Sequence, residues 1–109
     1  MGNRTSKTGT IEITGSVLSD VRAVPNPAKG IYPEIWFTVG QNNVSVKITV
    51  WDISGTEIGS KEIMCNIGSQ SVDLEDIVGE DIASGIYIYG VRAEGPETVE
   101  VINKLAIIR

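Results

Sequence analysis

The clearest pattern in the chain is a strict alternation of apolar and polar residues between Val44 and Trp51. The apolar positions are Val44, Val46, Ile48 and Val50, and the polar positions between them are Ser45, Lys47 and Thr49. Side chains of a β-strand alternate between its two faces, so this pattern predicts a half-buried strand. A slip of one residue would move four β-branched side chains into water, which means that the register is strongly specified.

Shorter runs rich in Val, Ile, Thr and Tyr recur every 8 to 12 residues, and turn residues separate them. No segment carries apolar residues at the 3.6-residue spacing of an amphipathic helix. About seven strands with such punctuation are typical of an antiparallel β-sandwich, so the predicted fold class is all-β. The strands are expected at Thr10–Thr14, Val17–Val24, Glu34–Val39, Val44–Trp51, Thr56–Cys65, Ser71–Leu74, Ile86–Glu94 and Thr98–Ile108.

Proline and glycine mark the predicted turns. Pro25-Asn26-Pro27 forbids a helix and removes two backbone donors, so it predicts a rigid corner at the end of a strand. Pro33 allows an edge strand from Glu34 to Val39. In the run Asp52 to Gly55 the aspartate favours a turn, and we expect Gly55 to adopt a positive φ. We expect the same of Gly85, which opens the run Ile86 to Glu94.

The predicted core combines the alternating strand with the run after Gly85. In that run Tyr87, Tyr89, Val91 and Ala93 share one face. We therefore expect the following residues in the core: Val46, Ile48, Val50, Tyr87 and Val91.

With 109 residues, the chain has the length of one domain. We expect a flexible N-terminal segment at residues 1–9 and a single sandwich domain at residues 10–109. No apolar run approaches the roughly 18–20 residues of a membrane span, and the first nine residues lack the apolar core of a signal peptide. Membrane insertion is therefore not expected, and a parent protein that is exported would carry its signal elsewhere.

Composition excludes several kinds of chemistry. The chain contains no histidine, which rules out Ser-His-Asp and Cys-His catalysis and histidine-ligated metals. The net charge is −5 and the nine basic residues are dispersed, so nucleic acid is a poor partner. Cys65 is the only cysteine, and a small buried residue is favoured over a reactive thiol. No cofactor motif is present, and we predict no enzyme activity.

Two groups of side chains could still bind a ligand. One is an acidic run that could supply oxygen ligands to Ca²⁺, although its spacing is not that of a calcium loop and a solvated loop is favoured; it comprises Asp73, Glu75, Asp76, Glu80 and Asp81. The other is a set of aromatic side chains that could stack on sugar rings: Tyr32, Trp36, Trp51, Tyr87 and Tyr89. Core and cross-strand packing is favoured for Trp51 and the two later tyrosines, and either Trp36 or Phe37 should face outward.

Four motifs in a fixed order resemble two related families. They are Val24-Pro25-Asn26-Pro27, the run Val46 to Ile58 containing Thr49-Val50-Trp51-Asp52-Ile53-Ser54-Gly55, then Ala83-Ser84-Gly85-Ile86-Tyr87, and finally Lys104-Leu105-Ala106-Ile107-Ile108-Arg109. Together they resemble the C-terminal sorting domain of type IX secretion cargo in the Bacteroidetes, and the immunoglobulin-like domain of the flagellar hook-capping protein. The resemblance covers Val24 to Arg109. An acidic loop between Leu74 and Ala83 is longer than in sorting domains, and the Trp-Asp-Gly segment of the hook-capping type is missing.

The resemblance implies an immunoglobulin-like sandwich that sorts a larger bacterial protein for secretion and attaches it to the cell surface without catalysing a reaction. It implies the secretion machinery or neighbouring domains as partners. The residues that it singles out as a sorting or structural motif are Pro25, Asn26, Pro27, Gly55, Gly85, Tyr87, Lys104 and Arg109. The alternative is a spacer or binding module, associated with carbohydrate or another domain. A chain that ends directly after its last strand favours the sorting interpretation.

Overall fold

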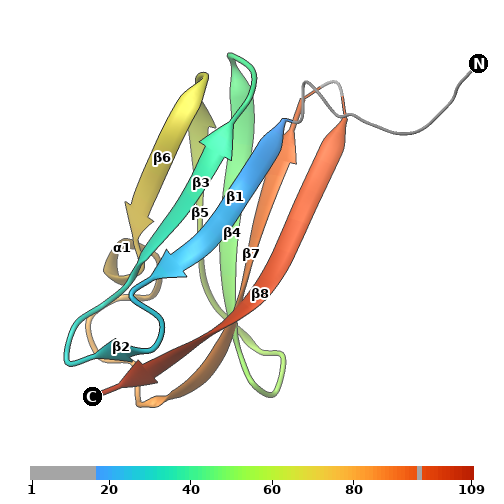
Figure 1. Ribbon diagram of the computed structural model, residues 1–109. Helices are drawn as coiled ribbons and strands as arrows, with labels where there is room; N and C mark the ends of the chain where they lie inside the picture. The colour runs from blue at the N-terminus through green and yellow to red at the C-terminus, as the bar shows by residue number, and fades with distance from the viewer. Residues whose placement is uncertain (1–16, 96) are drawn as a thin grey trace, which may run out of the picture.

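The computed structural model describes residues 17–95 and 97–109 (Figure 1). Eight strands in this part of the chain form two sheets, which confirms the predicted all-β sandwich. The smaller sheet has the order β1-β3-β6 and contains Leu18–Val24, Glu34–Val39 and Gly68–Asp73. The larger sheet has the order β2-β8-β7-β4-β5 and contains Ala28–Lys29, Thr98–Ile108, Gly85–Glu94, Val44–Asp52 and Glu57–Cys65. The expected strand Thr10–Thr14 and the expected segment 1–9 lie outside the described residues.

The strand with the clearest alternation, β4, lies inside the larger sheet and pairs with β5 on one side and β7 on the other. All five residues predicted for the core are buried, with Ile48 fully covered and Tyr87 8% exposed. Facing them across the sandwich are Ile35, Phe37 and Val39 of β3. Each of these positions matches the period of two in its strand, so the alternation alone places the core.

The smaller sheet corrects one prediction. The strand after Pro33 has the expected bounds, but it lies in the middle of its sheet and pairs with β1 and β6 on either side. Pro33 is buried and stands just before the strand. Because it lies outside the strand, its missing N–H removes no hydrogen bond between β3 and its neighbours, and the strand is not forced to an edge. The strand predicted at Ser71–Leu74 begins earlier, at Gly68, because it pairs with β3 along its whole length.

The acidic stretch after β6 forms one turn of helix, α1 (Glu75–Val78), and not only a loop. The helix packs against β5 at Gly59, where there is no room for a side chain. A Cβ atom at Gly59 would lie 2.1 Å from the carbonyl oxygen of Ile77, so only glycine allows this approach. This requirement was not apparent in the sequence, because the partner is 18 residues away.

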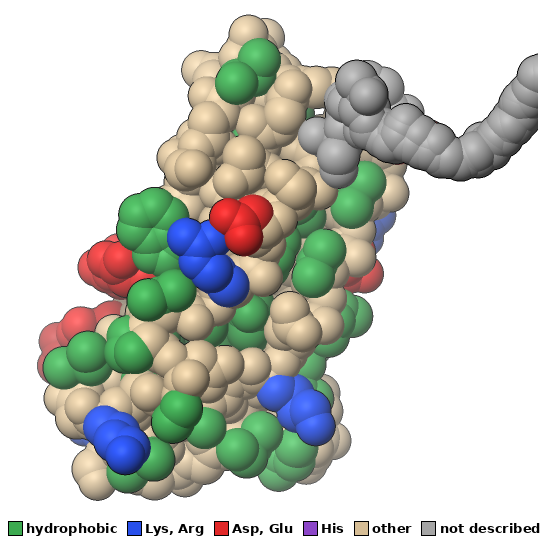
Figure 2. All heavy atoms as spheres, in the orientation of Figure 1, with side chains coloured by type: hydrophobic (Ala, Val, Ile, Leu, Met, Phe, Trp, Pro, Cys, Tyr) green, Lys and Arg blue, Asp and Glu red, His purple; other side chains and the backbone are tan. Residues whose placement is uncertain are grey.

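The outer face of the larger sheet divides into two parts. Toward the β7–β8 turn, the register places four charged side chains side by side across four strands: Glu100, Arg92, Lys47 and Glu62. Toward the C-terminus the same face is apolar, with Ile53, Ile86 and Ile102 between 45% and 68% exposed. Figure 2 views the molecule from the side of the smaller sheet, in the orientation of Figure 1, and shows its basic side chains separate from one another.

Within the described residues, no helix has the length and apolar character needed to cross a membrane.

Candidate functional site: the C-terminal strand and its clamp

Apart from Gly55, the residues that the sequence singled out come together around residues 104–109. β1 ends at Val24, and the corner Pro25-Asn26-Pro27 carries the chain from the smaller sheet to the larger one. Both peptide bonds that precede these prolines are cis. Beyond the corner, β2 pairs in parallel with β8, with Ala28 opposite Ile107. The predicted rigid corner therefore joins the two sheets beside the C-terminal strand.

Asn26 completes this junction with its side chain. Its Nδ2 donates to the carbonyl oxygen of Lys104 at 3.1 Å, and its Oδ1 accepts from the N–H of Ala106 at 3.1 Å. One side-chain amide thus makes the pair of bonds that a neighbouring strand would make with two successive outward positions of β8. The bonds continue along β8, since the N–H of Gly30 donates to the carbonyl oxygen of Ile108 at 2.8 Å.

Arg109 is held on the opposite side by the segment that leads into β7. Its N–H donates to Ser84 Oγ at 2.7 Å, and its guanidinium donates to the carbonyl oxygen of Ile82. The guanidinium also lies over the Tyr32 ring, 5.7 Å from the ring centre, a cation–π contact. The Tyr32 hydroxyl in turn donates to the carbonyl oxygen of Glu80, so the ring and the guanidinium bind the same segment.

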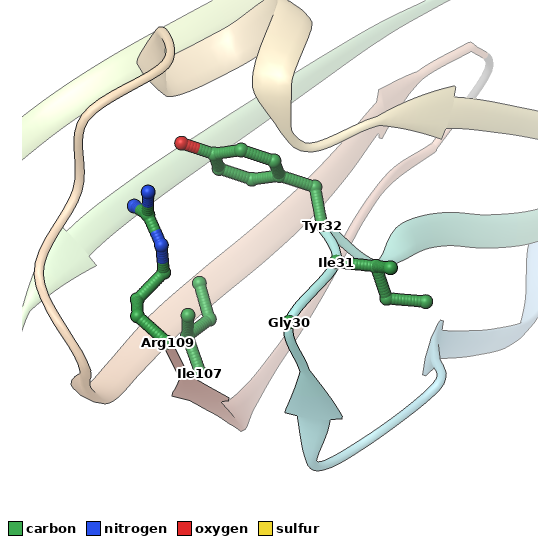
Figure 3. A pocket seen from close by; sticks show the side chains of 5 residues that line it. All are labelled: Gly30, Ile31, Tyr32, Ile107 and Arg109. Atoms are coloured by element: carbon green, nitrogen blue, oxygen red, sulfur yellow. The ribbon is translucent and has the colours of Figure 1, made fainter.

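These contacts define what we call the C-terminal clamp: Asn26, Gly30, Tyr32 and Ser84 around Lys104–Arg109. Figure 3 shows the part of it that surrounds a cavity of about 70 Å³. Tyr32 and Arg109 close one side of this cavity, and Ile107, which is 2% exposed, forms its apolar floor. Ile31 points away from Arg109 and is 58% exposed.

Lys104 and Arg109 differ in their surroundings. Arg109 is tied to backbone carbonyls, whereas the side chain of Lys104 lies on the outer face of the sheet. There it borders an open groove of about 350 Å³, whose other lining residues are Ile53, Ile88, Ile102 and Asn103. The two ends of the terminal motif thus present a fixed cation and an accessible one.

Tyr87 and Gly85 bring the segment before β7 into position. The Tyr87 ring is buried in the core, and its hydroxyl donates to the carbonyl oxygen of Ala83 at 2.6 Å. The expected positive φ at Gly85 is wrong. Gly85 is the first residue of β7, paired with Ile107, and the positive φ of this connection belongs to Gly79, at 86°. A Cβ atom at Gly85 would make only an ordinary contact of 3.9 Å with the Tyr87 ring.

Gly55 meets its prediction, with a φ of 93°, in a turn that Asp52 organises. Asp52 Oδ1 accepts from Ser54 Oγ at 2.6 Å, from the N–H of Ser54 at 3.0 Å and from the N–H of Thr56 at 2.9 Å. The hydrogen bond from the Ser54 hydroxyl is the main cause that lowers the pKa of the Asp52 carboxyl below its ordinary value, and the hydrogen bond from the Thr56 N–H is the second. This turn is separate from the clamp, so Gly55 has a structural role in the hairpin.

The other candidate residues are not gathered into a site. The five acidic residues of the predicted cluster are all exposed, and the described residues contain no three potential ligands close enough to hold a metal. Tyr87 and Tyr89 are buried. Trp36 and Trp51 belong to different sheets, each half-buried, so the aromatic side chains do not form one platform. Cys65 is buried, as favoured, and its burial raises the pKa of the thiol.

The sequence indicated Tyr32 only as an aromatic candidate for sugar stacking and Ser84 only as part of the motif before Tyr87, and it did not single out Gly90. The contact of Tyr32 with Arg109 could not be predicted, because 77 positions of the chain separate the two residues. At Gly90 a Cβ atom would lie 3.1 Å from the Trp51 ring, which packs across β7 at this point.

Comparison with known proteins places this arrangement in a family. The family model for the secretion system C-terminal sorting domain matches residues 22–107, from the strand before the corner to the clamped end of β8. Among solved structures, the chain is similar to PorZ, described as an essential bacterial surface component of the type IX secretion system of Porphyromonas gingivalis. That similarity has 22% sequence identity and a TM-score of 0.49, and it covers 82% of this chain and 11% of PorZ, so the chain spans about a tenth of that protein.

No curated protein matches the chain. Domains of the matched family are sorting signals of type IX secretion, and they mark proteins that are exported to the cell surface or secreted. Because the match spans about four fifths of the sequence, the chain belongs to the family of secretion system C-terminal sorting domains.

Proposed function

We propose that the module sorts a larger protein for type IX secretion and surface attachment without catalysing a reaction, and that the secretion machinery reads the clamped end of β8. The observation that carries the proposal is the convergence of the conspicuous sequence motifs on one place. Asn26, Ser84 and the terminal residues belong to three of the four motifs, and they bind one another directly.

The clamp gives a physical reason for this convergence. A strand segment without neighbours on one side is poorly ordered unless other groups hold it. Here the backbone of residues 104–109 is bonded on both edges, to Asn26, β2 and Gly30 on one side and to β7 and Ser84 on the other. A partner that reads this end therefore meets a fixed surface, so binding costs little ordering entropy.

The charge and exposure of the side chains at this end of the molecule suit recognition by a partner better than catalysis. Arg109 and Lys104 lie at the same end of the molecule as the apolar outer face with Ile53 and Ile102. A basic rim beside an apolar patch suits a protein partner. The clamp offers backbone carbonyls, one guanidinium and two hydroxyls that already take part in hydrogen bonds, those of Tyr32 and Ser84; this is no set of groups for acid–base or nucleophilic catalysis.

A spacer or binding module is the second candidate, and the groove beside Lys104 favours it. An exposed apolar surface of this kind suits contact with a neighbouring domain of the same protein. In that case the apolar face would matter for the parent protein and the clamp would serve only stability.

A reporter fusion tests the two functions. In a host with type IX secretion, a periplasmic reporter that carries the intact module is expected at the cell surface. Arg109→Ala and Asn26→Ala should reduce surface delivery, while Arg92→Ala, an exposed arginine on β7 outside the clamp, should leave it unchanged. Circular dichroism on each purified module checks that it is folded. If the intact, folded module leaves the reporter in the periplasm, sorting is wrong and the spacer interpretation takes its place.

A further inference from the structure

The apolar half of the outer sheet face contains a groove that is separate from the cavity of the clamp. Its volume is about 350 Å³, and residues on both sides of β7 line it: Ile53, Ile88, Ile102, Asn103 and Lys104. Ile88 belongs to β7, Ile102 belongs to β8, and Ile53 comes from the turn after β4. Ile53 and Ile102 are both more than half exposed. Neighbouring apolar side chains that face solvent in this way are typical of a binding site.

The Trp51 ring separates this groove from the charged part of the same face. A Cβ atom at Gly90 would lie 3.1 Å from the Trp51 ring, so the indole lies across β7 at this glycine. Side chains alternate along a strand, and Gly90 therefore stands between Ile88 and Arg92 on the outer face. The groove is thus bounded by an apolar ring toward Arg92 and has its charged group, Lys104, on the β8 side.

Lys104 brings one positive charge to an otherwise uncharged lining. Its partner in the register is Ile88, and the other residues that line the groove carry no charge. Within residues 17–95 and 97–109 the ion pairs lie elsewhere, and none involves Lys104. A small number of polar groups beside an aliphatic surface fixes the orientation of a ligand in its site. The groove is therefore complementary to a ligand with an anionic head and an aliphatic body.

The dimensions and lining of the groove favour an alkyl chain over a protein segment. Its walls lie on the β4 side and the β8 side of β7, so about 10 Å separates the flanking strands, and isoleucine side chains fill part of that width. An α-helix with its side chains is about 10–12 Å across and is too wide to enter. An extended peptide is narrower, but apart from Asn103 and Lys104 the lining is aliphatic and leaves peptide N–H and C=O groups without partners. An alkyl chain has no such groups.

We propose that this groove binds a single-chain amphiphile with a carboxylate head. The aliphatic chain lies along Ile53, Ile88 and Ile102, and the carboxylate binds the Lys104 ammonium. The volume of the groove is at the lower end of the range of small-molecule sites, which suits one short chain. Lys104 takes part in the clamp only through its backbone carbonyl, which accepts from Asn26. The two sites therefore use different groups of this residue, and the proposal does not depend on the sorting function.

Titration of the full chain with decanoate, followed by methyl NMR spectra, tests the site. The methyl signals of Ile53, Ile88 and Ile102 should shift and reach saturation, whereas those of Ile31 and Ile67, which are exposed outside the groove, should not. Hexanoate should bind at least about tenfold more weakly, because its chain buries fewer methylene groups. Equal shifts of all five isoleucines, or no shift of the three in the groove, would overturn the proposal.

Two lysine variants test the role of the charge. Lys104→Gln leaves the backbone bond to Asn26 in place but removes the cation, so it should weaken decanoate binding severalfold. The matched control, Lys47→Gln, removes an exposed cation from the same face outside the groove and should bind decanoate as the parent does. Thermal unfolding checks that both variants are folded. Equal affinity of Lys104→Gln and the parent would overturn the proposal.

A second copy of the chain over this face would give a different result. In that case the methyl signals of Ile53, Ile88 and Ile102 would shift with protein concentration in the absence of decanoate, and sedimentation would show a dimer. This outcome would also overturn the proposal, because the groove would then be a protein interface. A monomer whose three methyl signals respond to decanoate and not to protein concentration is the expected result.

Discussion

The two halves of β8 lie in the same sheet and share the same partner, β7, yet they differ in their outer neighbours. Residues 104–109 are bound by Asn26, by β2 and by Gly30, whereas the described residues leave 98–103 without an outer partner. Burial follows the same division: Leu105 and Ile107 are each 2% exposed, while Val99 and Val101 are only partly covered. The stability of this strand is therefore concentrated at its end.

This difference shows that strand stability depends on lateral contacts more than on composition. Both halves of β8 are rich in Val, Ile and Leu, and both alternate. What distinguishes them is a corner 78 positions earlier that places one asparagine side chain beside Lys104. Residues 104–109 thus have neighbours on both edges, whereas within the described residues the beginning of the same strand has one only on the side of β7.

The largest effect is expected from truncating a side chain in the clamped half. Leu105→Ala removes a buried leucine and should lower the free energy of unfolding by about 2–5 kcal/mol. Val101→Ala, in the open half, should cost only about 1 kcal/mol, because its side chain is partly exposed and loses fewer buried methyl groups. Urea denaturation measures both. Equal losses would contradict the division between the halves.

The second largest effect is expected at Asn26, whose side chain creates the difference between the two halves of β8. Asn26→Ala removes two hydrogen bonds at an exposed position, so a loss of about 1–2 kcal/mol is expected. Asn26→Asp keeps the size and the acceptor but loses the donor to Lys104, and it should retain part of the stability. The amide of Ala106 should exchange faster in Asn26→Ala than in the parent. An unchanged Ala106 amide would mean that Asn26 does not stabilise β8.

Glycines on the two sides of the clamp make a finer comparison. Gly30 has a φ of 73°, so Gly30→Ala should destabilise the protein by about 1 kcal/mol, although nothing lies within 4 Å of the added methyl group. Gly85 is an extended, exposed strand residue, and Gly85→Ala should be neutral or stabilising by up to about 1 kcal/mol. Thermal unfolding of the pair distinguishes them. A larger loss at Gly85 than at Gly30 would restore the sequence-based expectation for Gly85.

The sequence predicted the parts of the fold that depend on local patterns. Alternation placed the core of β4 and β7, and Asp52 with Gly55 marked a real turn with a positive φ. What it could not predict are relations between distant segments. The proline before β3 suggested an edge, but the chain places β1 and β6 on either side of that strand.

The same distinction holds for the clamp: the sequence indicated some of its residues but not their contacts. Pro25-Asn26-Pro27, Ser84 and Arg109 were all within the motifs quoted from the sequence, so their importance was visible there. Their partners were not: that Asn26 reaches Lys104, or that Tyr32 lies under Arg109, depends on how the corner joins the two sheets. Gly85 shows the converse error, because the glycine that supplies the positive φ is Gly79, six residues earlier.

The smallest effect on stability is expected at Arg109, and it is the most informative for function. Arg109 is exposed, so Arg109→Ala should change the free energy of unfolding by no more than about 1 kcal/mol. Its guanidinium is nonetheless fixed over Tyr32 by a bond to the carbonyl oxygen of Ile82. If the secretion machinery reads this cation, surface delivery of the reporter should fall severalfold while thermal unfolding stays almost unchanged.

Two further variants separate the position of this charge from its presence. Arg109→Lys keeps the charge but loses the planar contact with the ring, so intermediate delivery is expected. Tyr32→Phe keeps the ring under the guanidinium and removes only the hydroxyl bond to Glu80, so it should resemble the parent. If Arg109→Ala delivers the reporter as well as the parent does, the machinery reads another part of the module. The accessible Lys104 beside the apolar groove is then the next residue to replace.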